Sequence, residues 1–329
     1  MAVGMISALK SFLRIQTYLL LSIYVIGGTM IGILQGGRID LAGITAALVV
    51  IAAWYVNATS INDLADYEID KVNLAGDADR PLVSKGFSRQ ATVLVAIVSG
   101  IVALVVSLVG GVAGIGIVAV MLALNVAYSL RPVRISRRGI WALLLLPLGY
   151  VGLTVGIGYI ATGASLIAVP WGLVAALYVQ FFARITLKDY RDVVGDAKFG
   201  KMTFLLRRGP RATARLAIGA HMLSVIGLVV FLPDAHLVGQ VGLALLAGIG
   251  LNYLMRLAAA TVWDSQRVWI TAFGRISTGI LVITFVQIGL AAGLVNGGIG
   301  GDIVIMVIVG VVILSAQRII GQARVSQSS

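Results

Sequence analysis

Hydrophobic residues run along this chain in long blocks that short polar stretches separate. A helix that crosses a bilayer needs about 20 mostly apolar residues, and the blocks approach or reach that length. The pattern therefore predicts an all-α integral membrane protein, a polytopic bundle of nine to ten transmembrane helices. The ten blocks cover residues 12–35, 40–58, 91–110, 113–130, 140–162, 166–187, 214–232, 237–260, 270–295 and 302–319.

Composition supports the membrane class. The chain is 59% hydrophobic and only 12% charged, whereas a water-soluble protein of 329 residues needs far more polar surface. No long polar linker interrupts the blocks, so we predict a single transmembrane domain over 1–329, with 302–319 as a possible extra C-terminal helix. The absence of cysteine excludes disulfides and thiolate-bound metals.

The basic residues predict an orientation. The formal net charge is +12, and short cytoplasmic loops of membrane proteins collect Lys and Arg. With a cytoplasmic N-terminus and ten spans, Arg38 alone of the 25 basic residues falls on the outer side. We therefore expect the positive charge to reflect membrane topology, with lipid and not nucleic acid as the partner. The plasma membrane is the expected location.

The acidic residues are concentrated in two short segments. Nine of the 13 acids lie within 63–79 and 189–196, which is not how a solvated surface distributes charge. In both segments aspartates recur at i, i+3 and i+7, a spacing that places carboxylates on one face of a helix. Glu68 points about 140° away from Asp63 on such a helix. The first array is Asn62, Asp63, Asp66 and Asp70, and the second array is Asp189, Asp192 and Asp196.

Converging carboxylates indicate a bound cation. Four spans separate the two arrays, so both lie at the same membrane face, where they would repel each other without cations. Mg²⁺ prefers oxygen ligands and is typically bound by carboxylates together with substrate phosphates. We therefore expect two or more Mg²⁺ ions, held by the two arrays, to bridge a diphosphate.

Basic residues follow both arrays and suit the same ligand. Together with metal they would stabilise charge that grows on a diphosphate leaving group. Lys201 belongs to this basic group. Candidate phosphate-binding residues are Arg80, Lys85, Arg191 and Lys198, and candidate catalytic residues are Asp66, Asp192, Lys188 and Arg134.

Two motifs resemble a known family. The stretch N-D-L-A-D-Y-E-I-D at 62–70, followed by R-P-L-V-S-K-G at 80–86, resembles the first signature of the UbiA superfamily of intramembrane prenyltransferases. The stretch K-D-Y-R-D-V-V-G-D at 188–196, with Gly200 and Thr203 beyond it, resembles the second signature. The two signatures and the helical background cover nearly the whole chain.

The resemblance implies a reaction and a site. The expected activity is Mg²⁺-assisted ionisation of a prenyl diphosphate, followed by attack of a lipophilic acceptor (an aromatic or quinone precursor, or a lipid) within the membrane. The two arrays would then hold the metal. The Y-S-L-R-P-V-R stretch at 128–134 resembles branches that prenylate chlorophyll precursors and plastoquinone-type rings.

Two alternatives stay open at this point. A membrane terpene cyclase would share the ionisation step, but the cation would attack its own double bonds. A divalent-cation transporter would use the arrays to bind its cargo. The clustering of acids at one membrane face disfavours the transporter, because transporter sites usually lie near the bilayer midplane.

Overall fold

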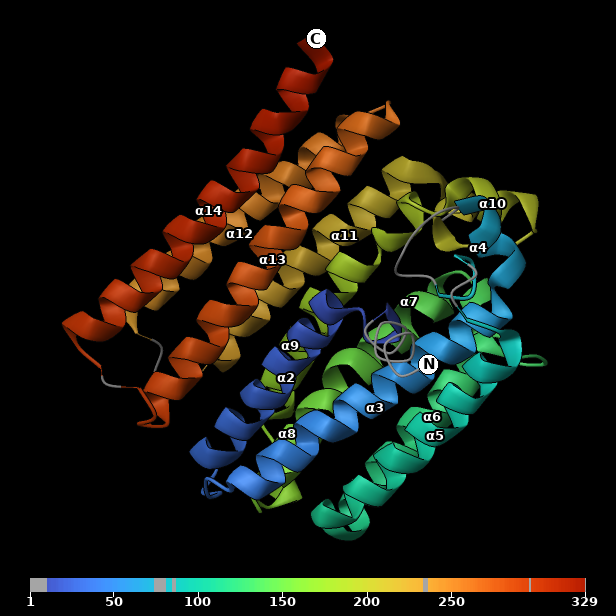
Figure 1. The fold of residues 1–329 in the computed structure, drawn as a ribbon. Coiled ribbons are helices and arrows are strands. Elements are labelled where there is room, and N and C mark those ends of the chain that lie inside the picture. Colours follow the sequence, from blue (N-terminus) through green and yellow to red (C-terminus); the bar gives the residue numbers. More distant parts are fainter. Residues whose placement is uncertain (1–10, 74–80, 85–86, 233–235, 296, 329) are drawn as a thin grey trace. The chain divides into compact units, whose positions relative to one another are not determined.

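The computed structural model describes residues 11–73, 81–84, 87–232, 236–295 and 297–328, and all regular structure in these ranges is helical (Figure 1). Eight helical stretches in them are long and apolar enough to cross a membrane. One of these, Arg89–Ser129, contains two successive helices. The all-α membrane class is therefore confirmed.

The helices coincide with the hydrophobic blocks. The turn between the third and fourth blocks lies at Gly111, whose φ of 62° is a value that glycine adopts readily. The block 302–319 lies inside the last helix. One block is formed by α7 (Ile140–Pro147) and α8 (Thr154–Ile160), which the π-helical turn Leu148–Leu153 joins into one stretch. The other helices of the blocks are α2 (Ile15–Leu34), α3 (Leu41–Ala65), α5 (Arg89–Ser107), α6 (Gly111–Ser129), α9 (Trp171–Ile185), α11 (Phe204–Phe231), α12 (Leu237–Ala259), α13 (Trp263–Ala291) and α14 (Ile299–Ser328).

The chain forms two compact units. Unit 1 contains residues up to Ile167 together with Asp192–Arg207, and unit 2 contains Ala168–Arg191 and Arg208 onward. The last boundary falls at a kink in α11, where Gly209 has a φ of 79° and Pro210 follows. The single domain over 1–329 stays a prediction.

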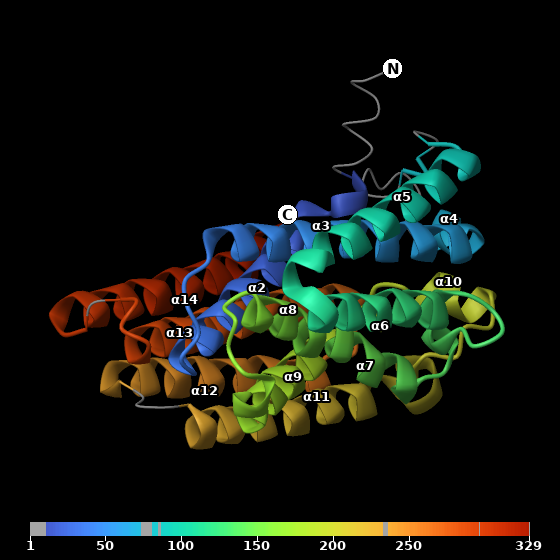
Figure 2. The ribbon, with the colours of Figure 1, turned by 90° about the horizontal axis from the view of Figure 1, so that it is seen from below.

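In unit 1, helix α3 packs against α2, α5, α6 and α8 (Figures 1 and 2). The α2–α8 contact is close because glycines face backbone there. A Cβ at Gly158 would lie 2.0 Å from the carbonyl oxygen of Val25, so only glycine fits. This is how membrane helices commonly approach each other.

Buried polar bonds fix α3 against its neighbours. Asn57 Nδ2 donates to the carbonyl of Ala96 on α5 at 2.8 Å, and Asn125 Nδ2 on α6 donates to Asn57 Oδ1 at 2.8 Å. Trp54 Nε1 donates to the carbonyl of Met121 on α6 at 3.2 Å. Unpaired polar groups are costly in lipid, so these pairs favour one arrangement of the three helices.

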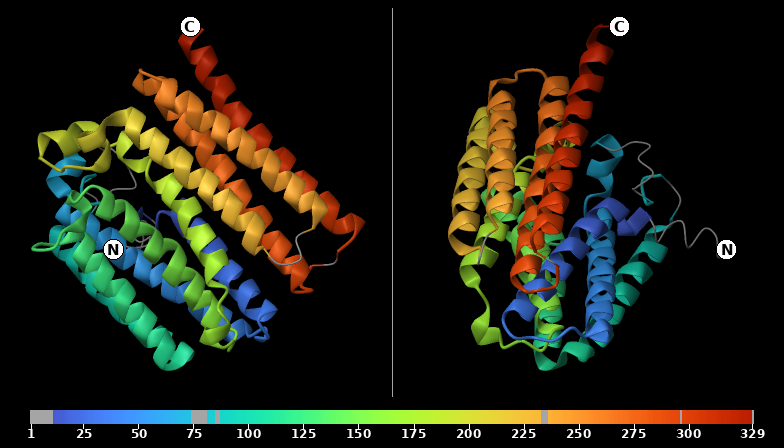
Figure 3. Two further views of the ribbon diagram at one scale, coloured as in Figure 1. Left: turned by 180° about the vertical axis from the view of Figure 1, so that it is seen from behind. Right: turned by 90° about the vertical axis from the view of Figure 1, so that its left-hand side faces the viewer.

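Unit 2 is built from α9, the larger part of α11, and α12 to α14 (Figure 3). Its interior holds a polar cluster in which His221 contacts Gln180 on α9 and the carbonyl of Ala247 on α12. Ser224 donates to the same Gln180 oxygen. These bonds tie α9, α11 and α12 together without an exposed polar group.

Candidate functional site

The first array lies where α3 ends. Helix α3 stops at Ala65, Asp66 is its C-cap residue, and the short helix α4 (Tyr67–Asn73) begins directly afterwards. The array therefore does not occupy one continuous helix, but its predicted face is present. Asp63, Asp66 and Asp70 are 2%, 4% and 6% exposed, whereas Glu68 is exposed and pairs with Lys71.

The second array does not form the helical face that its spacing predicts. Asp189 lies in a 3₁₀ turn (Lys188–Tyr190), Asp192 is the N-cap residue of α10 (Val193–Lys198), and Asp196 lies inside α10. Because α10 begins only at Val193, after the 3₁₀ turn, the three aspartates do not share one helix. The single-helix prediction for this array is wrong. Asp189 belongs to unit 2, whereas the other two belong to unit 1.

Within unit 1 the two motif segments lie side by side, with α4 packed against α10. Asn73, at the end of α4, makes two bonds to the second segment. Its Nδ2 donates to the carbonyl of Asp192 at 3.0 Å, and its Oδ1 accepts from the Gly195 amide at 2.6 Å. Sequence reasoning missed Asn73, although it follows Asp70 by three residues on the same helical face.

Lys201 joins the two arrays. Its Nζ lies 3.3 Å from Asp66 Oδ2 and 3.4 Å from Asp196 Oδ1, and both carboxylates are buried. The backbone supports this position, because the Lys201 amide donates to the Asp196 carbonyl at 2.8 Å. A cation between two buried carboxylates offsets their repulsion in a medium of low dielectric constant.

Arg134 contacts the first array from the loop after α6. One guanidinium nitrogen donates to Asp66 Oδ1 and to the Ala65 carbonyl, both at 2.7 Å. Burial would raise the pKa of Asp66, but the charges and hydrogen bonds of Lys201 and Arg134 outweigh it, so that the pKa lies below its ordinary value. Asn62 Nδ2 also donates to Asp66, at 3.3 Å. Asp66 is therefore an ionised carboxylate with cations on two sides.

A residue that sequence reasoning assigned to topology also reaches this site. Arg14, which precedes α2, donates through Nη2 to Asp63 Oδ1 at 2.6 Å. No sequence signal separates this arginine from the other basic residues at helix ends.

The other predicted basic residues are placed differently. Arg80 and Lys85 lie outside the described residues. Arg191 and Lys198 are exposed, and the Lys198 ammonium lies 5.9 Å from the ring of its neighbour Phe199. Lys188 lies 3.5 Å from Asp189 in unit 2.

The carboxylates have the chemistry of a magnesium site. Buried carboxylates and the Asn62 amide oxygen are hard oxygen donors, which Mg²⁺ prefers. In the part of the chain that the structure describes, no three acidic or histidine side chains are grouped as a metal would need. Asp63, Asp66 and Asp196 instead pair with Arg14, Arg134 and Lys201. The oxygen donors are therefore of the type that Mg²⁺ prefers, and in this structure basic side chains neutralise the carboxylates.

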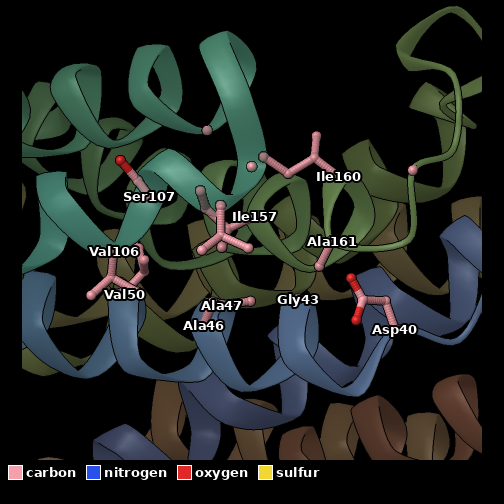
Figure 4. Close-up of a pocket in the computed structure, with 14 residues that line it drawn as sticks. Asp40, Gly43, Ala46, Ala47, Val50, Val106, Ser107, Ile157, Ile160 and Ala161 are labelled. Carbon is pink, nitrogen blue, oxygen red and sulfur yellow. The ribbon is translucent and has the colours of Figure 1, made fainter.

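A pocket of about 190 Å³ lies in unit 1 near the start of α3, remote from the carboxylates (Figure 4). At about 1.5 Å per residue, Ala47 in its wall is roughly 30 Å along the helix from Asp66. Most residues in its wall are glycine or have apolar side chains, and the carboxylate of Asp40 in it caps α3 by accepting from the Ala42 amide at 3.0 Å. We assign no chemistry to this pocket.

Comparison with known proteins identifies the family. The model of the UbiA prenyltransferase family matches residues 20–278. The chain belongs to the UbiA prenyltransferase family. This membership confirms the resemblance to the UbiA superfamily.

Three curated relatives are each 27% identical to the chain. The match to the chloroplastic 2-acylphloroglucinol 4-prenyltransferase of Humulus lupulus covers 51% of this chain and 42% of that protein. The match to the bacteriochlorophyll synthase 33 kDa chain of Cereibacter sphaeroides covers 59% of this chain and 63% of that protein. The match to the digeranylgeranylglyceryl phosphate synthase of Thermococcus kodakarensis covers 69% of this chain and 74% of that protein. The chain thus spans less than two thirds of the first two.

Solved structures share the fold. A digeranylgeranylglyceryl phosphate synthase structure matches with a TM-score of 0.66 and 18% identity, covering 86% of this chain and 98% of that one. A UbiA homologue from Archaeoglobus fulgidus, bound to DMAPP and Mg²⁺, matches with a TM-score of 0.58 and 19% identity, covering 86% and 99%. At this identity the likeness concerns the fold.

Proposed function

We propose that this protein is a Mg²⁺-dependent prenyltransferase that ionises an isoprenyl diphosphate and transfers the prenyl group to a lipophilic acceptor in the membrane. One observation carries the proposal: Lys201 bridges Asp66 of the first array and Asp196 of the second. One carboxylate from each of two acidic motifs that lie far apart in the sequence thus contacts the same ammonium near the end of α3. Family membership supports the same reaction.

The chemical step is a substitution at an allylic carbon. The bond between C1 of the prenyl chain and the bridging oxygen breaks, and its electron pair leaves with diphosphate. A nucleophilic atom of the acceptor bonds to C1 and then loses a proton. Mg²⁺, when bound, neutralises the diphosphate and so stabilises it as a leaving group.

The chain's own residues supply the surrounding charge. Asn62, Asp63, Asp66, Asp70, Asp192 and Asp196 would hold the metal ions, with Asp189 of unit 2 as a further predicted ligand. Lys201 and Arg134 would donate to diphosphate oxygens, where growing negative charge is stabilised most strongly in a site that excludes water. Lys188, Arg191, Lys198, Arg80 and Lys85 stay predicted contacts of the diphosphate.

The acceptor is proposed by analogy to be a lipophilic ring. The stretch 128–134, which carries Arg134, resembles branches that act on chlorophyll precursors, and a bacteriochlorophyll synthase chain is among the relatives. The site is proposed to face the cytoplasm, in the plasma membrane, because the Lys and Arg residues are distributed asymmetrically between the loops. A cyclase would share every residue named here and differ in its product.

Product analysis tests this function. The detergent-solubilised protein is incubated with labelled prenyl diphosphates of ten to twenty carbons and Mg²⁺, with and without ring acceptors, and products are identified by mass. We expect an acceptor adduct that chelation with EDTA abolishes and added Mg²⁺ restores. Formation of a cyclic hydrocarbon in the absence of an acceptor would show that the protein is a terpene cyclase and not a transferase. Absence of any diphosphate release would contradict both.

A further inference from the structure

Two arginines at this site share an unusual backbone conformation. Among the described residues, Arg14 (φ 42°) and Arg134 (φ 37°) are the non-glycine residues with positive φ. Each donates to a carboxylate of the first array, Arg14 to Asp63 and Arg134 to Asp66. Left-handed backbone is unfavourable for residues with a Cβ, and such residues cluster at functional sites. The coincidence directs attention to Arg14, for which family motifs and sequence spacing suggest no role.

The segment before α2 holds Arg14 in place. The Phe12 side chain is fully buried, and its carbonyl accepts from the Thr59 hydroxyl on α3 at 2.8 Å. Its ring also meets the ring of Phe87 edge-on, with centroids 5.7 Å apart. Phe87 follows directly after the predicted phosphate-binding loop. Packing around Phe12 therefore fixes the backbone at Arg14 beside the array.

A topology signal does not require this arrangement. An arginine that only orients the first span can remain in water, whereas the Arg14 side chain is 20% exposed and Asp63 is 2% exposed. Burying an ion pair costs desolvation of both charges, so such pairs are poor devices for stability alone. Asp63 is also a predicted metal ligand, and a metal ion would compete with Arg14 for it.

We propose that Arg14 is an exchangeable internal cation of the diphosphate site. Without ligand it neutralises Asp63, and when metal and diphosphate bind together it leaves Asp63 to the metal and donates to a diphosphate oxygen. Arginine suits both partners, because its guanidinium matches carboxylate and phosphate oxygens alike. The proposal rests on the proposed function and adds that the two ligands bind cooperatively. The metal binds weakly when it is alone and tightly only when diphosphate is also bound.

The exchange predicts effects of opposite sign. Removing the Arg14 charge frees Asp63 and should tighten metal binding in the absence of diphosphate. The same change removes a donor to diphosphate and should weaken its binding in the presence of metal. A purely structural arginine would instead weaken both, because loss of packing disturbs the whole array.

The test measures the two affinities separately, with no turnover. Mn²⁺ binding is followed by electron paramagnetic resonance, and binding of inorganic diphosphate at saturating Mn²⁺ by calorimetry. For Arg14→Gln we expect metal binding several-fold tighter and diphosphate binding about tenfold weaker, the usual size for a hydrogen bond to a charged group. Arg14→Lys should stay close to wild type. Arg89→Gln, at an exposed arginine that begins α5, is the matched control and should change neither.

The Asp63→Asn variant provides a second test in case Arg14→Gln alone does not fold. Asp63→Asn with Arg14→Gln leaves no unpaired buried charge, and it should bind diphosphate about tenfold more weakly than Asp63→Asn alone. Equal diphosphate affinity of these two variants, or parallel weakening of metal and diphosphate binding in Arg14→Gln, overturns the proposal. A further outcome is that the wild type binds Mn²⁺ and diphosphate, and Arg14→Gln changes the two affinities in opposite directions, while no prenyl product forms. In that case the proposed function fails and the exchange stands. Wild type that binds no diphosphate refutes both.

Discussion

The Lys201 ammonium lies 3.3 Å from Asp66 Oδ2, although 135 residues separate the two along the chain. Because Lys201 also lies 3.4 Å from Asp196, one side chain connects the middle of the first acidic motif with the end of the second. This contact makes Lys201, rather than Lys198, the basic residue of the 198–201 stretch that reaches the site. The exposed Lys198 extends over the ring of Phe199.

Lys201 should therefore matter far more for activity than Lys198. Lys201→Ala leaves Asp66 and Asp196 facing each other without this cation and removes a proposed donor to the leaving group. We expect turnover to fall about 10²-fold or more, as when one preorganised donor to developing charge is lost. Steady-state assays of Lys201→Ala and the control Lys198→Ala compare the two. A larger loss in Lys198→Ala would show that ligand binding reorganises the site.

Glu68 provides a matched control for Asp66, two residues apart with opposite exposure. Asp66→Ala should reduce turnover by several orders of magnitude, because it removes a proposed metal ligand and the partner of Arg134 and Lys201. Glu68→Ala breaks an exposed pair with Lys71, which contributes little to stability. Initial rates and thermal unfolding of both variants give the answer. Comparable loss of activity in the two would refute the one-face interpretation of the first array.

Membrane orientation can be measured directly, because the chain contains no cysteine. Ser84 follows the first array and Ser165 lies between α8 and α9, and both are exposed. We expect an impermeant thiol reagent to label Ser84→Cys only from the cytoplasmic side and Ser165→Cys only from the outside. Labelling of intact cells and of inverted vesicles compares the two. Labelling of both from the same side would show that the predicted topology is wrong.

Hydropathy and spacing predicted the helices and the buried face of the first array, because each depends on local periodicity. They did not predict the break at Asp66 or the division of the second array. Those features depend on tertiary partners such as Asn73, which binds the backbone of Asp192 and Gly195.

The ion pairs of the site were equally hidden. Sequence patterns indicated Arg134 and Lys201 as candidate diphosphate contacts, but they did not indicate the carboxylate partners of these residues, and they assigned Arg14 to topology alone. Only the folded chain selects the partner of each, since the pairs join residues 49 to 135 positions apart.

The last prediction concerns the group attached to the diphosphate. The carboxylates lie where α3 ends, and the preceding turns of α3 present Val50, Ile51, Trp54 and Tyr55 to an apolar core. Such surroundings favour a hydrocarbon tail over a sugar or nucleotide. Each buried CH₂ contributes about 0.8 kcal/mol, so apparent affinity should rise from a ten-carbon to a fifteen- or twenty-carbon prenyl diphosphate until the available space is filled.

Competition assays measure this preference. Increasing amounts of unlabelled prenyl diphosphates of each length, or of ADP, compete with a labelled prenyl diphosphate at fixed Mg²⁺. We expect the twenty-carbon compound to compete best and ADP to compete poorly, although both carry a diphosphate that can bind the same cations. Because the headgroup chemistry is shared, the difference reports on the tail alone. Equal inhibition by ADP and the twenty-carbon prenyl diphosphate would mean that the site recognises diphosphate and metal only, and the prenyl assignment would fall.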